Sequence, residues 1–564
     1  MRVHFLLGPA GSGKTWRCLE EIRSELRHAP DDPAPLLLLT PKQATFQLER
    51  QLLDDPALAG YTRLQIVSFD RLAHWLLGTF AALPELLDDE GRVMVLRALL
   101  AREHEALRVF RATARLPGFA RQLSQLLREL QRHQVTPERL ASLSAKCDEN
   151  TSLRDKLHDL HHLLRAYHTW LAGSGIQDAD QLLDLTTAML RKDSFPKRHG
   201  AYPIAVLWLD GFAEMTPQEL DLLCAVLPLC RRSTLAFCLG PQAEAPSSWL
   251  SLWSVVRRTY EDCRKRVERL TGQLTTEQLP REAAPTRFSG NPVLARLEAS
   301  WTTISDPRSA TNTEPPAAAP ALRLAECAHP EAEAALAARE ILRHVRAGGR
   351  FRDCAVILRT LDHHHAALRR AFTRCGIPFF LDRREPVTHH PLAELTRFAL
   401  RTLAYGWQPD DWFGALKTGL AHDCDEDIDW LENLALAHGW RGAHWHSPLA
   451  AHEPGFDLPR AERLRRQLLT PFLQFSAALG VVPAAPSPQP ATSIPGSLLA
   501  AALRKLWEEL AVELRLQGWD DALRAAATPL AAFTAPPLHS SVLRQLHEWL
   551  DRSEEHTSEL QSRG

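Results

Sequence analysis

The chain lacks long hydrophobic runs and any excess of charge of one sign. Its longest apolar stretches, such as Leu36–Leu39 and Ile204–Leu209, have the length of a strand and are far too short to cross a bilayer. The N-terminal apolar stretch is also too short for the core of a secretory signal. We therefore expect a cytoplasmic protein without membrane contact. Because 66 Lys and Arg balance 68 Asp and Glu, no global positive field attracts a polyanion, and any nucleic-acid surface must be local.

Paired cysteines are missing as well. The ten cysteines include no Cys-x-x-Cys pair, which removes the usual signature of a zinc or dithiol site. Scattered single cysteines in a cytosolic chain are typically reduced core residues. What remains is an ordinary composition, 45% hydrophobic and 24% charged over 564 residues, which indicates a globular protein of about three to four domains.

One motif stands out near the N-terminus. Residues Gly8 to Thr15 read Gly-Pro-Ala-Gly-Ser-Gly-Lys-Thr and follow the apolar run Val3–Leu7, which is typical of a buried strand. Glycines in such a loop permit positive φ and close backbone approach, so that successive N–H groups converge on phosphates. The expected nucleotide-binding residues of the loop are Gly8, Gly11, Gly13, Lys14 and Thr15.

Each residue type in this loop has an expected role. Lys14 would reach the β- and γ-phosphates of ATP, and Thr15 would hold Mg²⁺. A helix from Thr15 to about Arg27 would direct its positive dipole end at the anion. The alternative is a glycine-rich turn between a strand and a helix without a ligand.

The strand, turn and helix pattern repeats along the chain. Leu36–Leu39 and Leu64–Val67 each lead through a polar turn into a helix, and the apolar runs Ile204–Leu209 and Thr234–Leu239 resume the pattern later. This repetition predicts an α/β fold with a parallel sheet, whose ligands bind at the carboxyl ends of the strands. Between these groups, from about Leu83 to Lys192, a Leu-, Arg- and Gln-rich helical period indicates an inserted helical region. After the linker, a second α/β unit is expected, with a strand at Leu322–Leu324, a helix from Glu331 to about Arg346 and a strand at Cys354–Leu358.

An acidic residue at the end of a later strand completes the expected Mg²⁺ site. Asp210 follows Ile204–Leu209 and holds that position. A hydrolysing motor of this class places a Glu directly after the Asp to activate the attacking water, but here the next residue is Gly211. Glu214 is the nearest substitute, although a surface carboxylate is the simpler interpretation. The sequence therefore predicts ATP binding with weak or no hydrolysis.

Several ordered motifs resemble the AddB family, the B subunits of bacterial AddAB (RexAB) helicase–nucleases. They are the phosphate loop, Gln43–Gln47, Ser68–Ala73, Leu209–Glu219, Arg352–Arg359, Gly376–Asp382 and His389–Leu392. The resemblance implies a superfamily-1 helicase-like fold that has lost motor function, with two P-loop-type parallel-sheet domains and large helical insertions. It also implies an AddA-type partner subunit, single-stranded and double-stranded DNA as partners, and a role in scanning DNA for a hotspot sequence during double-strand break repair.

By the same resemblance, Gln43, Thr45, Phe69 and Arg71 match the family's strand-contacting positions. The residue types suit the task, because Gln and Thr offer hydrogen bonds to base edges, Phe offers a stacking face, and Arg pairs with phosphate. Each also has an ordinary interpretation: Phe69 in the core, Gln43 and Thr45 at a helix start, and Arg71 in solvent. Arginines in the helical region could line a DNA channel or form a solvated charged face.

The resemblance also divides the chain into parts. We expect a helicase-like domain 1A in residues 1–85 and 201–301, a helical insertion 1B in 86–200, a linker in 302–321, a helicase-like domain 2A in 322–405, and a helical domain 2B in 406–551. Residues 552–564 resemble a translated sequencing adapter. The family's nuclease domain, its metal and its iron–sulfur cluster are expected only beyond this sequence, so the chain is not expected to cut DNA.

Two other function classes remain open from the sequence. An active superfamily-1 helicase would require a Glu after Asp210 and the later arginine motifs of a second motor domain. A P-loop phosphotransferase would require no DNA, so stimulation of ATP hydrolysis by single-stranded DNA separates the two classes.

Overall fold

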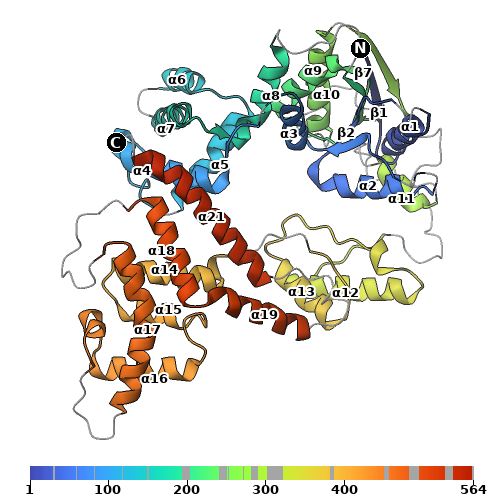
Figure 1. The fold of residues 1–564 in the computed structure, drawn as a ribbon. Coiled ribbons are helices and arrows are strands. Elements are labelled where there is room, and N and C mark those ends of the chain that lie inside the picture. The colour runs from blue at the N-terminus through green and yellow to red at the C-terminus, as the bar shows by residue number, and fades with distance from the viewer. Residues whose placement is uncertain are drawn as a thin grey trace. The chain divides into compact units, whose positions relative to one another are not determined.

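The computed structural model describes most of the chain, in two compact units, Met1–Leu324 and Ala325–Gly564. Figure 1 shows the elements of each unit. The described residues are 1–28, 32–56, 58, 60–81, 83–116, 118–148, 151–192, 203–240, 251, 253–270, 272–280, 290–300, 322–381, 387–449, 457–481, 494–526 and 538–561. The predicted linker 302–321 and the last three residues lie outside them.

The first unit is built on a parallel sheet of six strands (Figure 1). Its strands are β1 (Arg2–Gly8), β2 (Leu36–Leu39), β3 (Leu64–Val67), β6 (Ile204–Leu209), β7 (Cys230–Cys238) and β8 (Gln273–Gln278). They lie in the order β3-β2-β6-β7-β1-β8, and every neighbouring pair is parallel. The predicted α/β fold with a parallel sheet is therefore confirmed.

Helices cover both faces of this sheet, because the strands are apolar on both sides. Phe5 and Leu207 point into a core formed with α3 (Phe69–Phe80), α8 (Leu182–Arg191), α9 (Pro217–Val226) and α10 (Ser254–Glu268). Leu6 and Trp208, one residue further along, point into a second core with α1 (Lys14–His28) and α2 (Thr45–Leu53). Strands buried on both faces read as continuous apolar runs, which is why the sequence located them.

The helical insertion has a core of its own. It contains α4 (Asp89–Glu103), α5 (Phe119–Arg132), α6 (Pro137–Ala145) and α7 (Ser152–Ser174), tied by the short parallel pair β4 (Leu86–Leu87) and β5 (Gln177–Asp178). Its buried residues run from Leu87 to Ile176. Helix α8, also inside the expected range 86–200, instead packs Leu182 and Leu190 into the core of the sheet. The unit ends with α11 (Pro292–Ser300).

The described part of the second unit is helical. Helices α12 (Pro330–Arg346) and α13 (His365–Arg374) share a small core. A larger core, centred on Trp407, Trp412 and Trp445, joins the remaining helices. These are α14 (Pro391–Ala404), α15 (Pro409–Leu416), α16 (Asp425–His438), α17 (Leu458–Ala478), α18 (Gly496–Glu509), α19 (Val512–Ala526) and α21 (Leu538–Gln561).

The strands predicted at Leu322–Leu324 and Cys354–Leu358 are wrong for this structure. Both segments lie outside the helices and pair with no strand among the described residues. Leu324 is 101% exposed and Ile357 is 93% exposed. An apolar run becomes a strand only when a neighbouring backbone supplies its hydrogen bonds, and no described segment does so here. A second parallel-sheet domain is therefore not formed by the described residues.

Candidate nucleotide-binding site

The phosphate-type loop joins β1 to α1 at the carboxyl edge of the sheet. Gly11 and Gly13 adopt φ of 74° and 90°, a region that residues with a Cβ rarely occupy. Helix α1 then begins at Lys14 and has no acidic residue in its first turn, so its own side chains do not neutralise its positive end. Backbone N–H groups in such a turn form an anion-binding concavity.

Lys14 folds back over this loop. Its ammonium donates hydrogen bonds to the carbonyl oxygens of Gly8 (2.8 Å) and Pro9 (2.7 Å). Burial lowers the pKa of the Lys14 amine, because a desolvated ammonium is less stable than a hydrated one. A phosphate in the loop would replace two neutral carbonyls with an anion and would favour the charged amine.

Thr15 and Asp210 meet although they are 195 residues apart in the sequence. The Thr15 hydroxyl donates a 2.6 Å hydrogen bond to Oδ2 of Asp210, which β6 presents at its carboxyl end. Asp210 is only 6% exposed, and this burial raises the pKa of its carboxyl. The structure thus brings the predicted residues of the loop and the predicted acid into one site.

The surrounding cavity has the donors that Mg²⁺ prefers. It encloses about 480 Å³ and contains the Asp210 carboxylate and the Thr15 hydroxyl. The hydroxyl of Thr40, which is fully buried, has no hydrogen-bond partner among the described residues. Oxygen donors and a buried carboxylate without a full countercharge fit a nucleotide-bound Mg²⁺. The lining also includes Gly11, Gly13, Lys14, Trp16, Arg23, Gln47, Gln51 and Gly211.

The residue after Asp210 is unsuited to carry a carboxylate. Gly211 has φ of 88°, and a Cβ built on it would lie 3.2 Å from Cδ of Pro41. A Glu at position 211 would therefore have to adopt a backbone conformation that residues with a Cβ rarely occupy. Glu214, the alternative base, is exposed on the following loop.

The expected DNA-contacting residues follow two neighbouring strands. Gln43 and Thr45 follow β2, and Arg71 lies in the first turn of α3 after β3. Since β2 and β3 pair in parallel, these residues share one edge of the sheet. Gln43 and Arg71 are exposed, whereas Thr45 is half-buried and donates to the carbonyl of Lys42 at 3.0 Å.

Phe69, the expected stacking residue, is enclosed in the core. It is 2% exposed and lies edge-on to Phe212 with 5.2 Å between ring centroids. The ring face that the sequence assigned to a base is therefore covered in this conformation. Phe46, at the start of the helix that follows β2, is 73% exposed. Its exposure follows from the helical period of α2, because Leu48 and Leu52 occupy the buried side.

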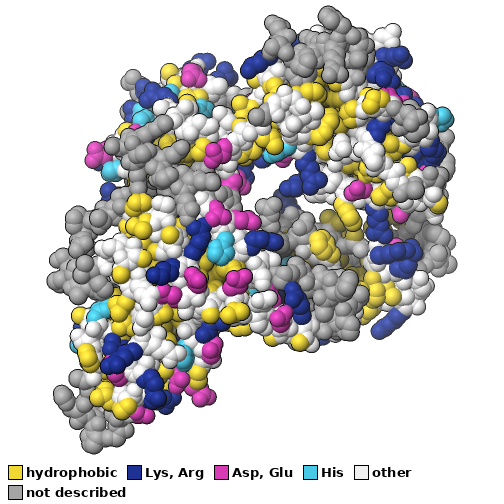
Figure 2. All heavy atoms as spheres, viewed as in Figure 1, with side chains coloured by type: hydrophobic (Ala, Val, Ile, Leu, Met, Phe, Trp, Pro, Cys, Tyr) yellow, Lys and Arg dark blue, Asp and Glu magenta, His cyan; other side chains and the backbone are white. Residues whose placement is uncertain are grey.

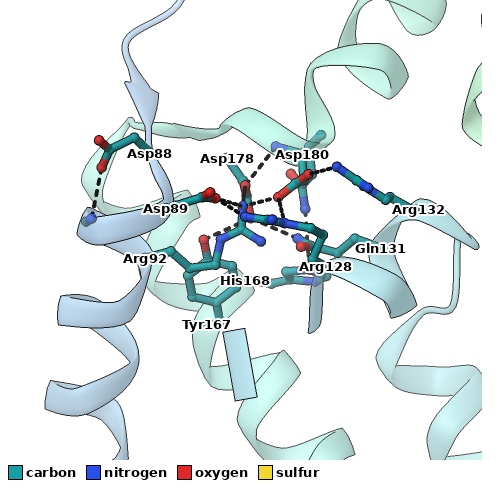
Figure 3. A network of polar contacts seen from close by, with 12 residues as sticks. Asp88, Asp89, Arg92, Arg128, Gln131, Arg132, Tyr167, His168, Asp178 and Asp180 are labelled. Carbon is teal, nitrogen blue, oxygen red and sulfur yellow. Dashed lines mark hydrogen bonds and ion pairs between the residues drawn. The ribbon is translucent and has the colours of Figure 1, made fainter. Parts of the chain in front are cut away.

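The arginines of the helical insertion do not form one free basic surface. Arg92 is fully buried and pairs with Asp178 at 2.8 Å and with Asp180 (Figure 3). Arg128 and Arg132 also reach Asp180. Arg92 therefore neither lines a channel nor lies on a solvated face, the two alternatives that the sequence left open. On the face shown in Figure 2, basic and acidic side chains are interspersed.

Comparison with known proteins places these observations in a family. The family model described as "ADDB, N-terminal" matches residues 5–298, which include the whole phosphate loop, Asp210 and the sheet edge. The chain belongs to the AddB family. The similarity extends beyond that region. A protein of Desulforudis audaxviator is 41% identical over 457 residues, and one of Symbiobacterium thermophilum is 37% identical over 455. Both are named as the B subunit of an ATP-dependent helicase/deoxyribonuclease.

The match covers only part of these AddB relatives. The alignment with the Desulforudis protein spans 79% of this chain and 38% of the relative. A Desulfitobacterium hafniense protein of the same name is 30% identical over 97% of this chain and 44% of its own length. The chain thus spans less than half the length of these AddB relatives. In the part of the chain that the structure describes, no helix is long and apolar enough to cross a membrane.

Proposed function

We propose that this chain is the nucleotide-binding and DNA-scanning part of the B subunit of a helicase–nuclease complex. It would bind Mg-ATP with weak or no hydrolysis and act beside an AddA-type motor in double-strand break repair and recombination. The observation that carries the proposal is the Thr15–Asp210 pair, joined at 2.6 Å and followed by Gly211 at φ 88°. This arrangement keeps the groups that bind a nucleotide and leaves out the one that activates water.

Lys14, Thr15 and Asp210 would each have a separate role in binding Mg-ATP. Lys14 would move from the carbonyls of Gly8 and Pro9 to the β- and γ-phosphates, while Thr15 and Asp210 would hold Mg²⁺ directly or through water. The bound Mg²⁺ would neutralise phosphate charge. Because no base is placed to orient and deprotonate water, the nucleotide would be bound but hydrolysed slowly or not at all.

DNA would cross the carboxyl edge of β2 and β3. Gln43 and Arg71 are exposed there and offer hydrogen bonds and a charge, and Phe46 offers the exposed ring. Thr45 would reach a base edge by exchanging its bond to the Lys42 carbonyl. Phe69 would support this edge from the core through its contact with Phe212. The family match motivates the single-stranded ligand and the scanning role.

The test measures nucleotide binding and turnover separately. A fluorescent ATP analogue with Mg²⁺ should bind the wild-type chain, and Lys14→Ala should abolish binding. Lys42→Ala, which removes an amine outside the phosphate loop, should leave it unchanged. Turnover of ATP should stay slow when single-stranded DNA is added. Rapid DNA-stimulated turnover would instead favour an active helicase, and turnover of a small-molecule phosphate acceptor without DNA would favour a phosphotransferase.

A further inference from the structure

The helical insertion contains a second cavity whose wall is basic. It encloses about 450 Å³ between α6 and α7. Its lining consists of Arg108, Ala141, Ser144, Ala145, Arg154, His158, His161, His162 and Arg165. No carboxylate is among these lining residues, whereas acidic and basic side chains alternate over much of the insertion. The cavity is therefore suited to an anion.

Helix α7 supplies most of this wall as one stripe. Arg154, His158, His161 and Arg165 follow one another at spacings of three or four residues, which places them on one side of the helix. The buried leucines of α7, such as Leu163, lie on another side. Helix α6 contributes only Ala141, Ser144 and Ala145, and these small side chains leave the cavity open.

Two neighbouring histidines of the lining, His161 and His162, are held by groups that do not line the cavity. Nδ1 of His161 lies 2.8 Å from the carbonyl oxygen of Pro137, and Nε2 of His162 lies 3.0 Å from a carboxylate oxygen of Glu103. Because a carbonyl or carboxylate can only accept, both nitrogens donate. These hydrogen bonds fix the orientation of both rings beside the cavity.

Two arginines on different elements complete the site. Asp159, which is fully buried, accepts hydrogen bonds from the backbone N–H groups of Arg108, Val109 and Phe110. It thereby fixes the loop that carries Arg108, whose side chain pairs with Asp155 at 2.9 Å. Arg165 is exposed, and its side chain forms no ion pair with any residue that the structure describes. Its guanidinium is thus ready for an external anion.

We propose that this cavity binds a backbone phosphate of DNA, with Arg165 and the stripe of α7 as its main contacts. Arginine matches phosphate oxygens with two parallel hydrogen bonds, and the cavity is large enough for a phosphate with its adjoining sugars. The contact carries no sequence information and would position DNA on the insertion. The inference rests on the proposed DNA-binding function and adds a site outside the sheet edge.

The test measures the affinity of the chain for labelled single-stranded and duplex oligonucleotides over a range of salt concentrations. Arg165→Gln should weaken binding about three- to tenfold at low salt. It should also make the plot of log affinity against log salt less steep by about 0.7–0.9, the effect of one lost phosphate contact. Ala145→Trp, which fills the cavity without changing any charge, should weaken binding in the same direction.

Lys156→Gln is the matched control. Lys156 is exposed on the same helix, but it lies two residues from both Arg154 and His158 and so points to the opposite side. Its loss should change affinity less than twofold. Circular dichroism verifies that each variant is folded.

The outcomes separate this inference from the proposed function. If the wild-type chain binds neither oligonucleotide, DNA binding itself fails. If the wild type binds and both cavity variants behave like Lys156→Gln, the cavity is not a DNA site. If inorganic phosphate binds the wild type but not Arg165→Gln in phosphorus NMR, while DNA affinity is unchanged, the cavity takes a free anion and the inference is overturned.

Discussion

Replacing Gly211 tests whether the backbone after Asp210 separates this chain from a hydrolysing motor. In Gly211→Ala the residue would have to keep φ near 88°, which costs an L-residue about 1–2 kcal/mol. The new Cβ would also start 3.2 Å from Cδ of Pro41, inside ordinary van der Waals distance. We therefore expect Gly211→Ala to lower the free energy of unfolding by about 2 kcal/mol, and Gly211→Glu to lower it at least as much.

Urea unfolding followed by circular dichroism measures this loss. Because two units can unfold separately, Leu223→Ala, which truncates a fully buried side chain of the sheet core, identifies the transition of the first unit. Gly78→Ala is the control, since Gly78 lies inside α3 and its Cβ would approach only Leu83 Cδ1 at 4.0 Å. Alanine is favoured over glycine in a helix by about 0.5–1 kcal/mol. The two glycine substitutions should therefore change stability in opposite directions.

Gly211→Glu should also fail to start DNA-stimulated ATP hydrolysis, because its side chain would begin against Pro41 and Thr40. The reasoning is refuted by a Gly211→Glu chain that is as stable as the wild type and hydrolyses ATP when single-stranded DNA is added. That result would mean that the wild-type chain lacks only the carboxylate for ATP hydrolysis and that the backbone at position 211 is no obstacle.

Four further substitutions test other parts of the structure. Phe46→Ala should weaken single-stranded DNA binding by about 1–3 kcal/mol in an anisotropy titration, whereas Phe69→Ala should lower the free energy of unfolding by about 3–5 kcal/mol. The reverse pattern would return the stacking role to Phe69. Arg92→Ala should destabilise the insertion by about 3–5 kcal/mol in urea unfolding, because the buried carboxylate of Asp178 would lose its ion pair. A loss under about 1 kcal/mol would contradict this. Burial, and then the neighbouring His539, lower the pKa of His390 to about 4. Between about pH 6.5 and 4, His390 is therefore protonated in the unfolded chain but mostly neutral in the folded state. Stability should fall as the pH drops from about 6.5 to 4, and His390→Asn should flatten that dependence in pH-dependent melts.

The sheet was predictable where its strands are buried on both faces. β2 (Leu36–Leu39), β3 (Leu64–Val67) and β6 (Ile204–Leu209) begin and end at the predicted residues. β2 and β6 lie inside the sheet and are buried at every position, and the edge strand β3 is buried at Leu64 and Val67. β8 (Gln273–Gln278) was missed, since its mostly exposed polar side chains carry no hydrophobic period. The apolar run Cys354–Leu358 was predicted as a strand but is not one. The sequence does not reveal whether a neighbouring strand is present to form hydrogen bonds with it.

The candidate site was predictable in its residues but not in their exposure. Motif spacing was enough to name Lys14, Thr15 and Asp210, because the loop and the strand end bring them to one edge. Motif spacing could not show that Phe46 is exposed whereas Phe69 is buried. Phe69 begins α3, and its burial depends on Phe212, a residue 143 positions later that packs against it.

The order of strands in the sheet also constrains how the chain is made. β6 lies between β2 and β7, so the leucines of β2 lack their inner neighbour until Ile204–Leu209 has been synthesised. At about 5–20 residues per second, the ribosome needs on the order of 10 s to produce the segment between β3 and β6. The helical insertion occupies that segment and has its own core from Leu87 to Ile176. This core can form before β6 has been synthesised and the sheet can be completed. β2 therefore stays without its inner neighbour during this delay, and slowing translation within the insertion should increase aggregation of the nascent chain.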